Sequence, residues 1–79
     1  MHKSLLIYPI SAGKELNVFS SEHISSVKIM DMSGNIVIGK ENIRGTHNTI
    51  DINLLPEATY IVEVRFTDQR TGRSVFVKM

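Results

Sequence analysis

Histidine, serine and aspartate are the side chains of this 79-residue sequence that could do chemistry. The three histidines, His2, His23 and His47, are spaced too widely for a short metal-binding motif, and the sequence contains no cysteine. We therefore expect them to be exposed residues of the N-terminal tail and of two loops. The sequence predicts no metal site and no cofactor.

The hydroxyl and carboxyl groups do not form a recognisable catalytic pattern. No serine lies in a Gly-x-Ser-x-Gly turn, and none is paired with a positioned base. Asp31, Asp51 and Asp68 each stand beside a turn or a strand end, where a carboxylate caps backbone N–H groups. A domain of this size also has little room for a ligand-sized cleft. The prediction is a protein that is not an enzyme and has no small-molecule substrate.

The overall charge excludes two further classes of function. Nine Lys and Arg against eight Asp and Glu give a net charge of +1, without the basic excess of a protein that binds nucleic acid or a membrane surface. No apolar run approaches the ~20 residues of a membrane-spanning helix. Arg65, Arg70, Arg73 and Lys78 make the C-terminal segment locally basic, which favours a soluble sheet edge.

Apolar and polar residues alternate along most of the chain, as in strands with one buried face. Tyr60, Val62, Val64 and Phe66, for example, share one side of a long run. Seven such runs are predicted at residues 4–8, 16–20, 26–31, 36–40, 49–52, 60–67 and 73–78. With turn signals about every 8–12 residues, they predict an all-β fold: a seven-stranded antiparallel immunoglobulin-like β-sandwich, one domain over residues 1–79.

Turn residues separate these runs. Gly34, within the turn at residues 31–35, can take the positive φ of a tight hairpin, and Gly72 is the expected left-handed residue of a second hairpin. Leu54 continues the alternation of the fifth run and is expected on its inner face. Pro56 ends that region, because proline cannot donate to a central strand ladder.

Several short motifs follow one another in a recognisable order. Tyr8 and Pro9 open the chain, Asp31 and Gly34 form a hairpin, Leu55, Pro56 and Tyr60 lead into the long strand, and Phe76, Val77 and Lys78 end the chain. This order resembles the C-terminal sorting domain of the type IX secretion system of Bacteroidetes, over about residues 5 to 79. Ala58 stands where that family usually has glycine, so we expect positive φ to be avoided there.

The resemblance implies a non-catalytic signal at the end of a larger secreted protein. Its expected partners are the outer-membrane secretion machinery, which reads the signal, and a sortase-like peptidase, which removes it. The expected route runs through the periplasm to the cell surface or the extracellular medium. Such a signal needs an accessible strand, and we expect residues 73–79 to provide it by β-augmentation or by docking. The same edges could pair two copies into a homodimer.

Two other functions compete with this one. The first is a retained immunoglobulin-like adhesion or accessory module of a bacterial surface protein. The second is a sugar-binding module, which needs an exposed aromatic platform. Five Phe and Tyr residues and no Trp make the sugar-binding module a poor candidate, because several of the five must fill the core.

Overall fold

A computed structural model describes residues 5–8 and 11–79 of the chain. Over these residues the backbone forms eight strands and no helix, so no helix there could cross a membrane. The strands are β1 (Leu5–Tyr8), β2 (Ser11–Ala12), β3 (Glu15–Ser20), β4 (Ile24–Asp31), β5 (Ile36–Lys40), β6 (His47–Asp51), β7 (Ala58–Phe66) and β8 (Thr71–Lys78). The expected count of seven is wrong, because the two-residue β2 lies outside every predicted run.

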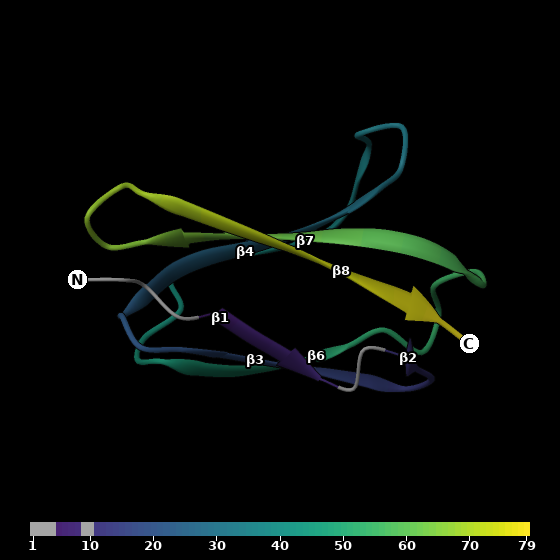
Figure 1. Cartoon of the computed structure of the whole chain (residues 1–79), viewed down its shortest axis with the longest axis horizontal. Coiled ribbons are helices and arrows are strands. Elements are labelled where there is room, and N and C mark those ends of the chain that lie inside the picture. Colours follow the sequence, from purple (N-terminus) through teal and green to yellow (C-terminus); the bar gives the residue numbers. More distant parts are fainter. Residues whose placement is uncertain (1–4, 9–10) are drawn as a thin grey trace.

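The strands form two sheets that face each other as the layers of a sandwich (Figure 1). One sheet has the order β1-β3-β6, and the other has the order β2-β8-β7-β4-β5. All pairs are antiparallel except β2 with β8, where Ser11 pairs with Val77 and Ala12 with Lys78 in parallel. The first two strands therefore belong to different sheets, β1 to the three-stranded sheet and β2 to the five-stranded one. The expectation of purely antiparallel sheets is wrong at the β2–β8 pair.

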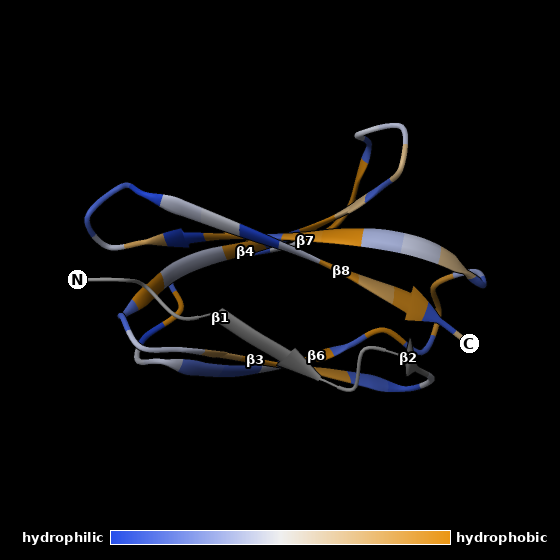
Figure 2. Ribbon diagram, viewed as in Figure 1, coloured by the Kyte–Doolittle hydropathy of each residue, from blue (hydrophilic) through white to orange (hydrophobic). Residues whose placement is uncertain are grey.

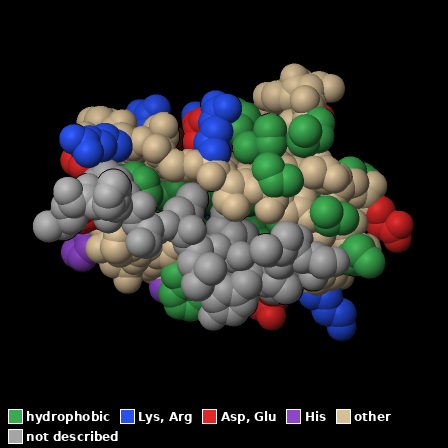
Figure 3. All heavy atoms as spheres, in the orientation of Figure 1, with side chains coloured by type: hydrophobic (Ala, Val, Ile, Leu, Met, Phe, Trp, Pro, Cys, Tyr) green, Lys and Arg blue, Asp and Glu red, His purple; other side chains and the backbone are tan. Residues whose placement is uncertain are grey.

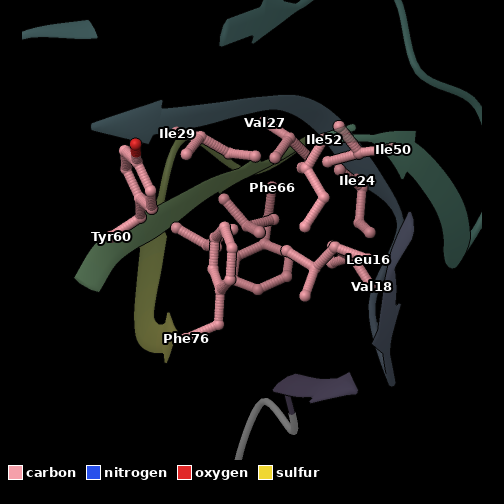
Figure 4. Close-up of a cluster of buried hydrophobic side chains, with 12 residues drawn as sticks. Leu16, Val18, Ile24, Val27, Ile29, Ile50, Ile52, Tyr60, Phe66 and Phe76 are labelled. Atoms are coloured by element: carbon pink, nitrogen blue, oxygen red, sulfur yellow. The ribbon is translucent and has the colours of Figure 1, made fainter. Parts of the chain in front are cut away.

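The core lies between the two sheets and is built by the predicted alternation. Along β7, Tyr60, Val62, Val64 and Phe66 are buried, whereas the residues between them are partly or fully exposed. Figure 2 shows hydrophobic stretches of ribbon in both layers, and Figure 4 shows apolar side chains from both layers meeting in the interior. The buried apolar residues are Leu16, Val18, Ile24, Val27, Ile29, Ile50, Ile52, Tyr60, Val62, Val64, Phe66 and Phe76. Each contributes about 1.5–3 kcal/mol relative to an exposed position.

Leu54 departs from the predicted alternation. Its side chain is 94% exposed, because β6 ends at Asp51 and the backbone then turns away from the sheet. The turn is closed by Leu55 N, which donates to Ile52 O at 3.0 Å, and by Asn53 N, which donates to Asp51 Oδ1 at 2.9 Å. Leu55 therefore packs against the core in place of Leu54.

The two hairpins share one hydrogen-bond pattern. In the β4–β5 turn, Asp31 N donates to Asn35 O and Gly34 N donates to Asp31 O, and Gly34 has a φ of 93° as expected. In the β7–β8 turn, Phe66 and Gln69 take the places of Asp31 and Gly34.

The left-handed residue of the β7–β8 hairpin is therefore Gln69, with a φ of 75°, and the expectation for Gly72 is wrong. Gly72 lies within β8 opposite Val64, because the ladder between β7 and β8 extends as far as the Arg65–Thr71 pair. Ala58, the first residue of β7, is not among the positive-φ residues, as expected.

Candidate recognition surface

A tyrosine closes the corner at which the chain passes from β6 in one sheet to β7 in the other. Tyr60 is 3% exposed, and its hydroxyl donates a hydrogen bond of 2.7 Å to the backbone carbonyl of Pro56. A tyrosine near the start of a strand that bonds back to the backbone upstream is the tyrosine corner of immunoglobulin-like sandwiches. Leu55 packs against the core beside it. Leu55, Pro56 and Tyr60 thus act together to fix the entry to β7.

The motif at the end of the chain meets this corner. Phe76 lies opposite Tyr60 in the ladder between β7 and β8, and their ring centroids are 5.6 Å apart at an interplanar angle of 25°. Phe76 is fully buried, and Figure 4 shows both rings at the same end of the core. These two motif residues are therefore part of the core and are not available to a partner.

The last residues of β8 alternate between the interior and the solvent. Phe76 faces inward, Val77 is 39% exposed, and Lys78 is only 7% exposed. Lys78 Nζ donates to the backbone carbonyl of Met79 at 3.2 Å. Of the predicted motif Phe76–Lys78, only Val77 presents a substantial part of its side chain to the outside.

One edge of β8 has little strand pairing among the described residues, although β1 of the other sheet lies close to β8. The opposite edge pairs with β7 along the whole strand, whereas β2 covers only Val77 and Lys78. Over residues 71–76 the outer edge has no strand partner in the described chain. An edge of this kind offers unpaired backbone groups to an added strand. The ladder thus leaves the outer edge of residues 71–76 without a hydrogen-bonded strand, while Phe76 and Lys78 have buried side chains, and recognition at residues 73–79 stays a prediction.

The ladder indicates which amides point toward this open edge. The hydrogen bond from Phe66 N to Arg70 O closes the ladder at the turn, and every second antiparallel pair beyond it is hydrogen-bonded. Thr71, Arg73 and Val75 therefore direct their N–H groups away from β7. These three amides are the donors that a strand added to β8 would use.

Asp31 caps the β4–β5 hairpin, as predicted. Its Oδ1 accepts from Asn35 N and from Ser33 N, both at 2.9 Å, and Asn35 Nδ2 donates to Oδ2 at 3.2 Å. These hydrogen bonds, those of Asn35 foremost, hold the pKa of Asp31 below its ordinary value. Asp31 and Gly34 therefore have a turn-forming role, and Asp31 lies opposite Tyr60 in the ladder between β4 and β7.

The remaining predicted site residues lie at the start of the chain. Tyr8 is the last residue of β1, and its backbone lies opposite Asn17 of β3. Pro9 lies outside the described residues. The structure therefore relates Tyr8 to the three-stranded sheet only through the backbone ladder.

The groups considered for chemistry do not assemble into a reactive site in the described part of the chain. His23 is exposed in a loop, as expected, and His2 lies outside the described residues. His47 differs from expectation, because it begins β6 and its ring stacks on Phe19 with centroids 4.1 Å apart. Asp68 Oδ1 accepts from Arg70 N at 3.0 Å, a turn cap. Among the described residues, no group of three His, Asp or Glu side chains could hold a metal ion.

The described surface has hollows, and three aromatic rings are buried in the core. Three surface hollows have volumes of 340–400 Å³, and no histidine lines any of them. Tyr60, Phe66 and Phe76 are buried, so three of the five Phe and Tyr residues cannot form an exposed sugar-binding platform.

Sequence reasoning missed an ion pair beside the open edge of β8. Arg73 Nη2 lies 2.7 Å from Glu63 Oε2, and Arg73 Nε donates to the same oxygen at 2.8 Å. The signal was present in the sequence, because residues equally distant from the centre of a hairpin face each other. Residue 68 is that centre, and Glu63 and Arg73 are each five positions from it.

Comparison with known proteins agrees with this geometry. The model of a family described as the secretion system C-terminal sorting domain matches residues 6–78. No curated protein matches the chain. A DUF3244-family protein from Bacteroides vulgatus, with an immunoglobulin-like β-sandwich fold, superposes with a TM-score of 0.76 at 18% identity, over 99% of this chain and 95% of that one.

A second solved structure, CopC from Methylosinus trichosporium, superposes with a TM-score of 0.60 at 16% identity. The match covers 98% of this chain and 91% of CopC. At these identities the two likenesses show the fold alone, and they confirm the immunoglobulin-like β-sandwich.

Proposed function

Because the chain belongs to the family of secretion system C-terminal sorting domains, we propose that it directs a larger cargo across the outer membrane by the type IX secretion system. The observation that carries this proposal is the family match over residues 6–78, nearly the whole chain. In this role the domain is a non-catalytic signal at the end of its cargo. It passes through the periplasm, and its destination is the cell surface or the extracellular medium.

The secretion machinery reads the folded domain through the open edge of β8. Tyr60 and Phe76 are buried and hold the strand in place, so they act as positioning residues. The contacts with the machinery come from the backbone of residues 71–76 and from the exposed side chains of Val75 and Val77. A sortase-like peptidase then removes the domain from the cargo. Pairing of two copies through the same edge stays a prediction.

Export of a cargo that carries this domain tests the sorting function. Removal of residues 75–79 in the native host deletes Phe76 and the end of β8, and we expect the cargo to remain inside the outer membrane. Immunoblots of the periplasmic, outer-membrane and extracellular fractions measure its location. Normal display of the truncated cargo at the surface would overturn the proposed function.

A proline substitution tests the open edge separately from the fold. Arg73→Pro removes an outward N–H group from the edge but leaves the ladder with β7 intact. Arg73→Ala is the matched control, because it also loses the ion pair with Glu63 and yet keeps the amide. We expect Arg73→Pro to block export and Arg73→Ala to permit it, with both domains folded by circular dichroism. Equal export of the two variants would exclude recognition at this edge.

A retained adhesion or accessory module is the second candidate function. The likeness to an immunoglobulin-like protein of Bacteroides favours it only at the level of the fold. Mass spectrometry of the mature surface protein distinguishes the two: a cleaved sorting signal is absent from it, and an accessory module is present.

A further inference from the structure

Three side chains in a row across the outer face of the five-stranded sheet alternate in charge. Lys28 of β4 lies opposite Glu63 of β7, and Glu63 lies opposite Arg73 of β8. Opposite charges on directly facing residues stabilise a sheet, whereas like charges destabilise it. The row ends with the positive charge of Arg73, at the edge of β8 where residues 71–76 have no hydrogen-bonded strand in the described chain.

Arg73 can bind a second carboxylate without giving up the first. Its Nε and Nη2 both donate to Glu63 Oε2, at 2.8 Å and 2.7 Å. A guanidinium group has five N–H donors, so three of them remain for another acceptor. The Arg73 side chain is also 64% exposed. The remaining donors therefore suit the paired hydrogen bonds that arginine makes with a carboxylate.

A row of apolar side chains lies next to the charged row, farther from the β7–β8 turn. It consists of Ile36, Met30, Ile61 and Val75, from β5, β4, β7 and β8 in that order. Val75 ends the apolar row at the same edge, and its side chain is 48% exposed. Figure 3 shows basic and hydrophobic side chains close together on the side of the molecule along which β8 runs. The edge thus presents a positive side chain and, two residues on, an apolar one.

We infer that the strand added to β8 carries an acidic side chain opposite Arg73 and an apolar side chain opposite Val75. The inference rests on the proposed function and deepens it, because it describes the segment of the secretion machinery that pairs with this edge. The amides of Arg73 and Val75 both point outward, so a strand bonded to them places its own side chains beside these two residues. Each row of the sheet then gains one residue, of opposite charge in the first row and apolar in the second.

Two short blocked peptides, each titrated with the purified chain by fluorescence anisotropy, test this inference. One has the order valine, threonine, glutamate, threonine, valine, which reads the same in both directions, and the other has lysine in place of glutamate. We expect the glutamate peptide to bind about three- to tenfold more tightly at low salt, because the lysine of the other peptide faces Arg73. Added salt should narrow this difference, since the charges are exposed.

Charge variants of the chain locate the preference. Arg73→Glu should reverse it in favour of the lysine peptide, and Arg73→Gln should remove it. Arg65→Glu is the matched control: it makes the same change in net charge at an exposed arginine, but Arg65 lies on β7, one strand farther from the edge. The preference for glutamate should persist in this control. Circular dichroism establishes that each variant is folded, and Arg73→Gln provides the comparison if Arg73→Glu does not fold.

Three results would overturn the inference. One is equal binding of the two peptides to the unmodified chain. Another is binding of neither peptide up to millimolar concentrations. The third is a preference that Arg65→Glu reverses as fully as Arg73→Glu, which would indicate a response to net charge and not to the edge.

Failure of the inference can be distinguished from failure of the proposed function, because peptide binding is measured without export. A domain that exports its cargo but binds both peptides equally would leave the proposed function standing. A domain that prefers the glutamate peptide, on a cargo that reaches the surface without residues 75–79, would contradict the proposed function instead.

Discussion

The two ends of the β7–β8 ribbon are held in different ways. At the end opposite the turn, here called the closed end, Tyr60 and Phe76 stack in the core. The Tyr60 hydroxyl donates a hydrogen bond to the carbonyl of Pro56. At the turn end, Gln69 takes a positive φ in an exposed loop, and the ion pair between Arg70 and Asp68 is long at 3.9 Å. Every motif residue of the ribbon lies at the closed end.

The difference shows what the family motifs do in this fold. Buried aromatic rings contribute several kcal/mol to stability, whereas an exposed ion pair contributes about 0–1 kcal/mol. The motif residues therefore hold the end of β8 in position, and the turn contributes little to this.

The largest expected effect on stability comes from removing the buried ring of Phe76 at the closed end. Phe76→Ala should lower the free energy of unfolding by about 3–5 kcal/mol, because it leaves a cavity beside Tyr60. Val77→Ala is the control, with a side chain that is already 39% exposed, and it should cost about 1 kcal/mol or less. Urea denaturation followed by circular dichroism measures both. Similar losses for the two variants would contradict the assignment of Phe76 to the core.

The next effect isolates the hydrogen bond of the corner. Tyr60→Phe keeps the ring and its stacking on Phe76 but removes the donor to Pro56, so stability should fall by about 0.5–1.5 kcal/mol. Tyr60→Leu also loses the aromatic stacking and should cost more. If Tyr60→Phe is as stable as the unmodified domain, the corner is held by packing alone.

The turn end should respond in the opposite direction. Gln69→Gly relieves a left-handed backbone and should stabilise the domain by about 0.5–1 kcal/mol, whereas Gly34→Ala, at the equivalent place in the β4–β5 hairpin, should destabilise it by about 1 kcal/mol. A Cβ at Gly34 would meet no atom within 4 Å, so the loss comes from the backbone alone. Thermal unfolding measures both, and the comparison fails if the two changes have the same sign.

The smallest expected effect is on pH dependence. The folded state lowers the pKa of Asp31, so this carboxylate stabilises the domain above its ordinary pKa, and that contribution is lost as the pH falls below about 4. Asp31→Asn should remove this part of the acid sensitivity. Unfolding experiments at pH 3 and pH 7, compared between the two proteins, measure it; an unchanged pH dependence would contradict the role of Asp31 as a charged cap.

Much of the fold could be predicted from the sequence because the longest strand, β7, buries every second residue. The alternation of Tyr60, Val62, Val64 and Phe66 places one face of β7 in the core without any knowledge of its neighbours. The four-residue spacing of Pro56 and Tyr60 in the sequence is compatible with a tyrosine corner. The hydrogen bond between them is seen only in the folded structure. Local patterns of this kind predict the structure correctly because the residues that form each pattern also contact one another in the fold.

The errors arise where distant pairing decides the outcome. Ser11–Ala12 is a strand only because it pairs with the end of β8, and Gly72 is extended because the ladder with β7 includes it. The apolar row on the outer face depends on the register of four strands, including a shift between Ile29 and Met30. Alternation within one segment contains no information about these registers.

The parallel pairing of β2 with β8 has a mechanical consequence. These strands run in the same direction, so tension between the chain before β2 and the chain after β8 pulls them lengthwise past each other. Under such shear, the hydrogen bonds of the pair are strained together and do not open one at a time. Tension applied to the two ends of the chain therefore loads the β1–β3 ladder and then this parallel pair in shear.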